Sequence, residues 1–141
     1  MSAFDRELLA AKSAAVERHL TRVANKLPEE PTDLQPGTDA SDAIVLHLWQ
    51  AVQLVLDVAF AACLHLRLPT PSTYADAFRA LAEHGAIDAA LAERLSRAAG
   101  FRNLVAHAYE NLDMLAVHAT ASRGPADLRA FLGALARLAP A

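Results

Sequence analysis

The chain has 141 residues, of which 54% are hydrophobic and only 6% aromatic, and it contains 5 glycines. Because strands draw on β-branched and aromatic residues, this composition favours helices, and the length predicts one all-α domain over residues 1–141. The formal net charge of -3 excludes a protein that attracts nucleic acid through an overall basic field, so any attraction for a polyanion has to be local.

Apolar residues recur at spacings of three and four from Phe4 to Leu27 and predict the first helix. Pro28 ends this helix. A polar stretch follows and is expected to be a loop, after which Ser41 or Asp42 is the expected N-cap of the next helix.

The second predicted helix, 43–66, is the most hydrophobic segment of the chain and is long enough to raise the question of a membrane span. Five polar side chains nevertheless fall within about 120° of its circumference. A helix that keeps one narrow polar stripe is typical of the centre of a helical bundle or of a subunit interface, so no membrane span is expected. The five residues are His47, Gln50, Gln53, Asp57 and His65.

A third helix is expected after Thr73, which begins a sequence close to a capping box, and Gly85 is expected to stop it. Asp88 is the expected N-cap of a fourth segment, which runs to about Ala99.

Two glycines mark the expected boundaries in the last third of the chain. Gly100 is expected to separate the fourth segment from a helix over 101–119. Gly124, followed by Pro125, predicts the start of a last helix that ends near Leu138. The expected architecture is an antiparallel bundle of about five to six helices around a four-helix core.

The octapeptide 102–109 concentrates the chemical groups of the chain. Arg102, Asn103, His107 and Tyr109 place a guanidinium, an amide, an imidazole and a phenol along about two helical turns. Arginine is always cationic and its planar fork matches phosphate oxygens, while histidine takes and gives a proton near neutral pH. Together these groups have the chemistry to bind and cleave a phosphodiester.

On a helical wheel the same four side chains lie away from an apolar face that includes Leu104. Asn103 and His107 are four residues apart, so we expect the amide to orient the imidazole. Arg102 and His107 are about 140° apart, too far to grip one phosphate from a single straight helix. A second copy of the helix across a two-fold axis would bring the missing group.

The spacing within the octapeptide is specific. Arg79 and His84 have the same separation, but they lack the asparagine after the arginine and the tyrosine after the histidine. With both additions, residues 102–109 resemble the motif of the HEPN ribonuclease toxins of the HepT type. The resemblance extends over residues 74–113, and the two preceding helices match in order and type, so it covers most of the chain.

The resemblance implies a HEPN-like helical bundle that forms a homodimer, with the motif helices of both protomers lining a cleft that cuts RNA without a metal. It implies that Arg102 binds phosphate, that His107 acts as base or acid, and that Asn103 has a positioning role. It also implies a partner, a nucleotidyltransferase antitoxin that adds AMP to Tyr109, where bulk and negative charge oppose entry of RNA.

Other interpretations of these residues stay open. Arg102 also has Asp113 and Glu110 as potential ion-pair partners on a solvated face, and His107 and Tyr109 also fit interface positions without a catalytic role. A second interpretation is that the same helical dimer is a non-catalytic module that docks a nucleotidyltransferase or a nucleotide. The net negative charge mildly favours this interpretation, because a nuclease benefits from a basic surface that attracts RNA. A purely structural dimer would leave the clustering of the four groups unexplained.

The sequence predicts neither a metal nor a cofactor, because it has no His-x-x-x-His spacing, no P-loop and no Gly-rich dinucleotide turn. His47 and His65 are about five helical turns apart, too far for one metal ion, and His19 and His118 have no supporting neighbours in sequence. The single cysteine, Cys63, and a charged N-terminus without an apolar core predict a cytoplasmic protein.

Overall fold

The computed structural model describes residues 5–138, and within that range it consists of helices and connecting loops without a strand. The predicted all-α bundle is therefore confirmed. Five α-helices and two short 3-10 helices follow one another in the order α1 (Arg6–Lys26), η1 (Pro31–Asp33), α2 (Asp39–His65), α3 (Tyr74–Glu83), α4 (Ala89–Ala108), η2 (Tyr109–Asn111) and α5 (Met114–Ala136).

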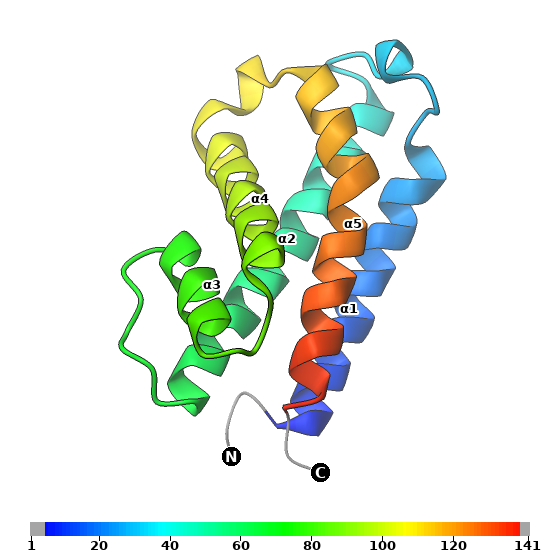
Figure 1. Ribbon diagram of the computed structural model, residues 1–141. Helices are drawn as coiled ribbons and strands as arrows, with labels where there is room; N and C mark the ends of the chain where they lie inside the picture. The colour runs from blue at the N-terminus through cyan, green and yellow to red at the C-terminus, as the bar shows by residue number, and fades with distance from the viewer. Residues whose placement is uncertain (1–4, 139–141) are drawn as a thin grey trace.

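The four long helices α1, α2, α4 and α5 run alongside one another, and the short α3 packs beside one end of α2 and α4 (Figure 1). α2 contacts each of the other four α-helices. The chain passes from α1 to α2 through η1 and from α4 to α5 through η2 at the same end of the bundle (Figure 1). This topology brings the first turn of α2 and the end of α4 together.

The apolar length of α2 is explained by these contacts. Among residues 5–138, α2 is the helix whose length and hydropathy match a membrane span, and 50% of its most apolar window is buried inside the protein. Its buried side chains, which include Ile44, Leu48 and Leu56, contribute to both clusters of the core. The position of α2 agrees with the central helix that its narrow polar stripe predicts.

The core has two clusters, and the smaller one fixes the end of the bundle at which α4 terminates. In the larger cluster, the rings of Phe78 and Phe131 meet edge to face with centroids 5.4 Å apart. In the smaller cluster, Phe101 and Val105 from α4 pack with residues of α1, α2 and α5. Phe101 directly precedes Arg102, and Val105 follows it by three residues. Burial of these two side chains therefore fixes the direction in which the Arg102 side chain projects from α4.

Several helix boundaries follow the predicted caps. The hydroxyl of Thr73 accepts a hydrogen bond from the backbone N–H of Asp76, and the carboxylate of Asp88 accepts one from Leu91 at 2.7 Å. Gly85 has a φ of +87°, a left-handed conformation that glycine adopts without steric cost. The predicted start of the third helix, the stop after it and the cap of the fourth are therefore confirmed.

The cap of α2 differs from the expectation of Ser41 or Asp42. Thr38 is the N-cap, and its hydroxyl and that of Ser41 form a reciprocal capping box. α2 consequently begins at Asp39, four residues before the predicted start. Asp42 lies in the first turn of the helix with its side chain exposed, available to a residue across the loop.

The predicted break at Gly100 is wrong, because α4 is continuous from Ala89 to Ala108. A glycine in a helix interior costs about 1 kcal/mol relative to alanine, which is less than the neighbouring side chains contribute by burial. Ala99 and Phe101, on either side of Gly100, are both buried. The helix also ends eleven residues before the predicted end at 119, since Ala108 is its last residue.

The predicted start of a helix at Gly124 and Pro125 is also wrong, because Pro125 lies inside α5. Proline inside a helix removes one backbone hydrogen bond and costs about 3 kcal/mol. Buried side chains precede and follow the proline in the helix, Val117 and Ala121 before it and Leu128 and Phe131 after it, and their burial offsets this cost.

Candidate functional site

Arg102 lies in the second half of α4, and its guanidinium is directed at the polar stripe of α2. Its Nε donates a hydrogen bond to the side-chain oxygen of Gln53 at 2.9 Å, and its Nη1 donates to Oδ1 of Asn103 at 3.1 Å. Gln53 is itself oriented, because its Nε2 donates to the carboxylate of Asp57 at 3.0 Å and approaches the hydroxyl of Tyr74 at 3.5 Å.

Two aromatic rings complete the surroundings of the guanidinium. The central carbon of Arg102 lies 6.0 Å from the ring centroid of Trp49 and 5.8 Å from that of Tyr74, at the outer limit of cation–π attraction. The Tyr74 ring is held in turn by an edge contact with Phe60, with centroids 5.1 Å apart. The guanidinium is therefore positioned by two side-chain amides and two rings.

None of the ion pairs among residues 5–138 involves Arg102. The alternative in which Arg102 pairs with Asp113 or Glu110 is not observed. The positive charge is thus fixed in direction by neutral partners and is not compensated by a contacting carboxylate. A guanidinium held in this way keeps its charge available to an anion that arrives from outside.

Asn103 and His107 both lie on the exposed side of α4. The oxygen of Asn103 accepts its hydrogen bond from Arg102, and within the described residues no hydrogen bond joins Asn103 to His107. The expected orientation of the imidazole by this amide is therefore not found. His107 makes no hydrogen bond to any described residue, so its imidazole is open to solvent.

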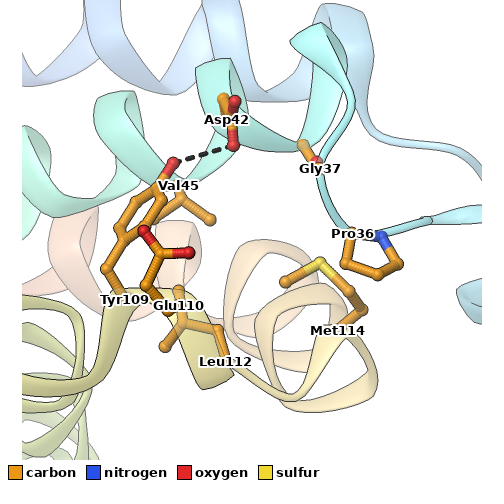
Figure 2. A pocket seen from close by; sticks show the side chains of 9 residues that line it. Pro36, Gly37, Asp42, Val45, Tyr109, Glu110, Leu112 and Met114 are labelled. Carbon is orange, nitrogen blue, oxygen red and sulfur yellow. Dashed lines mark hydrogen bonds between the residues drawn. The ribbon is translucent and has the colours of Figure 1, made fainter.

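The helical wheel predicts that Tyr109 lies on one face of the motif helix with Arg102, Asn103 and His107. In the structure Tyr109 lies outside α4. α4 ends at Ala108, which has φ -142° and ψ 35°, and Tyr109 begins η2. The Tyr109 hydroxyl reaches the first turn of α2 and donates a hydrogen bond to Oδ1 of Asp42 at 2.8 Å (Figure 2). After the helix ends, Leu112 packs on the smaller core cluster and Asp113 caps α5.

A cavity of about 390 Å³ opens beside the Tyr109 ring, between η2 and the start of α2 (Figure 2). The hydrogen bond to Asp42, partial burial and the negative charges of Asp42 and Glu110 raise the pKa of Tyr109, in that order of importance. Within the described part of the chain, no lysine or arginine is among the lining residues, which are Pro36, Gly37, Ser41, Asp42, Val45, Tyr109, Glu110, Leu112 and Met114.

The expected apolar face of the motif helix is only partly buried. Val105 is buried, but Leu104 is 46% exposed, and on α2 the side chains of Leu46 and Leu64 are 51% and 80% exposed. The wheel misplaced Leu104 because the core contacts the second half of α4 through Phe101 and Val105, which turns the neighbouring leucine outward. Exposed leucines therefore lie on both helices that hold the Arg102 contacts.

Comparison with known proteins places the chain in a family. The model of the family described as "Ribonuclease HepT-like" matches residues 15–135. This chain belongs to the HepT-like ribonuclease family. The chain is also similar to the mRNA nuclease HepT of Shewanella oneidensis, with 23% identity over 113 residues that cover 79% of this chain and 84% of that protein.

Two solved structures show the same fold as this HepT-like chain. The tri-AMPylated Shewanella oneidensis HEPN toxin in complex with MNT antitoxin has 21% identity and a TM-score of 0.80, covering 95% of this chain and 97% of that one. The cytosolic protein YutE of Bacillus subtilis, of unknown function, has 15% identity and a TM-score of 0.80, covering 98% and 92%.

Sequence reasoning missed the roles of four residues that surround the motif in this HepT-like chain. Gln53 was expected on the polar stripe, but its role as the acceptor for Arg102 was not predicted. Trp49 and Tyr74 gave no functional signal beyond their rarity in a chain with few aromatics. Asp42 was considered only as a helix cap, because its contact with Tyr109 joins residues 67 positions apart.

Three histidines outside the motif have partners that the sequence did not reveal. Nδ1 of His19 lies 3.0 Å from Nδ1 of His47, and the pKa of each is lowered chiefly by burial. His118 lies 2.7 Å from the carbonyl of Pro28. His19 and His118 have no supporting neighbours in sequence, and the fold gives each a partner that is distant in the chain. Within residues 5–138 no group of three or more His, Cys, Asp or Glu side chains has the arrangement to hold a metal ion.

Proposed function

We propose that this chain is a cytoplasmic, metal-independent endoribonuclease toxin that acts as a homodimer and is neutralised when a nucleotidyltransferase antitoxin adenylylates Tyr109. The observation that carries the proposal is the state of Arg102 in a HepT-like ribonuclease. Its guanidinium is oriented by Gln53, Trp49 and Tyr74 and has no carboxylate partner among the described residues. This arrangement favours binding of a phosphate oxygen and stabilisation of the charge that develops on it.

His107 supplies the proton transfer in this proposal. Its exposed imidazole is free of hydrogen bonds to the described chain, so it is accessible as the base for a ribose 2′-hydroxyl or as the acid for the leaving oxygen. Asn103 accepts a hydrogen bond from Arg102 and has the positioning role. No step requires a metal ion, because the guanidinium supplies positive charge and the imidazole transfers the proton.

A homodimer is proposed for two reasons. Arg102 and His107 leave α4 about 140° apart, so the two groups that meet one phosphodiester are expected to come from different protomers. Leu46 and Leu104 are also exposed on α2 and α4, and burial of such side chains stabilises an interface. A second copy that covers these leucines would place two motif helices on either side of one cleft.

The local positive charge that a protein of net charge -3 needs for RNA lies between α4 and α5. A cavity of about 210 Å³ there is lined by Arg94, Arg97 and Arg123. Arg94 pairs with Asp127 at 2.8 Å, but within the described residues neither Arg97 nor Arg123 makes an ion pair. We assign these two arginines to contacts with RNA phosphates beyond the scissile one.

Replacing both Arg97 and Arg123 with alanine is expected to weaken binding of a single-stranded RNA oligonucleotide and to flatten its salt dependence. Each lost phosphate contact lowers the slope of log affinity against log salt by about 0.7. Fluorescence anisotropy over a salt series measures both effects. The matched control removes Arg18 and Arg22, two exposed arginines of α1. Equal losses in both variants would contradict a local site and indicate a response to total charge.

The nucleotidyltransferase partner is proposed from the relative and from the position of Tyr109. The Shewanella HEPN toxin was solved AMPylated and in complex with MNT antitoxin. In this chain the corresponding candidate hydroxyl, that of Tyr109, belongs to a side chain 44% exposed and lies beside an open cavity. A transferring enzyme therefore has access to it.

Cleavage of total RNA by the purified wild-type protein in excess EDTA tests the proposed function. The preparation must first be shown by intact mass to carry no AMP. We expect cleavage to persist in EDTA and to leave 2′,3′-cyclic phosphate and 5′-hydroxyl ends, because the 2′-hydroxyl is the nucleophile when no metal activates water. Absence of cleavage would favour the alternative, a non-catalytic module that docks the nucleotidyltransferase.

A further inference from the structure

We propose that Asp42 positions the Tyr109 hydroxyl for adenylylation and accepts its proton as the bond to phosphorus forms, an inference that rests on the proposed function. The two residues are 67 positions apart in the chain, and the hydrogen bond of 2.8 Å between them joins η2 to the first turn of α2 (Figure 2). A group that removes a proton has to lie within about 2.6–3.2 Å of the atom that carries it, and Asp42 meets this condition.

The need for a proton acceptor follows from the charges around Tyr109. The charged groups that act on the hydroxyl are Asp42 from α2 and Glu110 from η2, and both raise the pKa of Tyr109. A phenol with its ordinary pKa of about 10 is already protonated at neutral pH, and the two negative charges make its nucleophilic phenolate scarcer. Transfer to a neutral phenol requires that its proton leave during the reaction.

Asp42 is the group placed to take that proton. Among residues 5–138 its carboxylate is the acceptor of the hydrogen bond from the hydroxyl, whereas Glu110 contributes charge without a hydrogen bond to it. The side chain of Asp42 is exposed at the first turn of α2, so a proton received there can pass on to water.

The proposed step is balanced in bonds and charge. The Oη–H bond of Tyr109 breaks and its proton passes to Oδ1 of Asp42. At the same time Oη forms a bond to the α-phosphorus of ATP. The bond between that phosphorus and the oxygen that bridges it to the β-phosphorus breaks, and pyrophosphate leaves. ATP and the groups that neutralise its triphosphate come from the nucleotidyltransferase, since neither lysine nor arginine lines this cavity within the described residues.

The cavity beside the hydroxyl gives the incoming nucleotide a direction of approach. It has a volume of about 390 Å³ and is open, and Asp42, Tyr109 and Glu110 lie on one side of it, with Pro36 and Met114 on the other (Figure 2). Because the hydrogen bond fixes the hydroxyl at the edge of this space, the oxygen is held where an adenylyl donor can reach it.

Three variants separate proton acceptance from placement and from charge. D42N keeps an oxygen that accepts the hydrogen bond but takes up no proton at neutral pH, whereas D42A removes both functions. E110Q is the matched control, because it removes one negative charge from the same cavity without altering the contact with the hydroxyl. Thermal unfolding of each variant shows whether the fold is retained.

The first measurement uses the chain alone. Tyr74 and Tyr109 are its two tyrosines, so ¹³C labelling at the tyrosine Cζ position gives two resonances that a Y109F spectrum assigns. We expect D42N and D42A to lower the pKa of Tyr109 more than E110Q does, because the hydrogen bond to Asp42 is the largest cause of the raised value. An unchanged pKa in D42N and D42A would overturn the inference.

The second measurement is the rate of adenylylation by the partner nucleotidyltransferase with ATP, followed by intact mass. We expect D42N and D42A to lower this rate by about 10²-fold or more, with E110Q close to wild type and the KM for ATP unchanged. The rate of D42N should rise about tenfold per pH unit from about pH 6 to about pH 9, as phenolate replaces the missing acceptor, while the wild type rises less.

The outcomes distinguish this inference from the proposed function. A folded D42N protein that is adenylylated as fast as wild type overturns the role of Asp42 and leaves adenylylation of Tyr109 intact. A wild-type protein that the partner does not modify overturns the proposed control of the toxin, and the role of Asp42 with it.

Discussion

Replacing His107 with alanine is expected to lower the rate of RNA cleavage by about 10²–10⁴-fold, the usual contribution of a positioned acid or base. The substitution removes the exposed imidazole of the motif, and no group in contact with it can replace its proton transfer, because His107 has no hydrogen bond to a described residue. The measurement is a time course on a labelled RNA in EDTA. KM is expected to change much less than kcat, since binding rests on the arginines.

A second arginine–histidine pair with the same separation as Arg102 and His107 supplies the control for this prediction. His84 also follows an arginine, Arg79, by five positions and is exposed at the end of α3. H84A should therefore leave cleavage at the wild-type rate. Both variants should unfold within about 0.5 kcal/mol of wild type, because exposed positions without contacts tolerate substitution. A folded H107A protein that retains full activity would contradict the assignment of His107.

The fold was largely predictable from local signals. The spacing of apolar residues and the caps Thr73 and Asp88 depend on neighbours in the chain, and they define elements that the structure confirms. The failures occurred where local rules competed with packing. Gly100 and Pro125 are helix breakers by propensity, and each lies within a continuous helix whose buried residues outweigh that preference.

The candidate site was predictable in its residue types but not in its geometry. The motif names the groups of the octapeptide, but it assumes one helix through Tyr109, whereas the chain leaves the helix after Ala108. The contacts that orient Arg102 and Tyr109 come from Gln53 and Asp42, which are 49 and 67 positions away in the chain. No periodicity within one helix carries that information.

The same long-range contacts explain how one short motif supports two chemistries in the proposed function. Arg102 is turned toward the amide and rings of α2 and α3, where its charge is uncompensated, and Tyr109 is turned toward Asp42 at the first turn of α2. A cationic position for RNA phosphate and an anionic position for the tyrosine are thus separated by the end of α4. Were Tyr109 to continue the helix, its wheel position would place it near Arg102.

Replacing Arg102 with alanine is expected to lower kcat/KM for RNA by about 10²–10³-fold, the typical loss when a donor that stabilises developing negative charge is removed. R102K should recover little of this loss. Lysine keeps the charge, but it lacks the planar fork and the Nε donor that bonds to Gln53, so its ammonium is not directed by the amide and rings.

Gln53 provides the test of orientation as opposed to charge. Q53L removes the acceptor that orients Nε of Arg102 but retains the guanidinium and its charge, so we expect a smaller loss than in R102A, about tenfold. R79A is the control, because Arg79 is an exposed arginine engaged with Asp76 and Glu93 on the outside of α3. Wild-type activity in R102K would show that a point charge is sufficient, and the directed guanidinium would then not be the basis of activity.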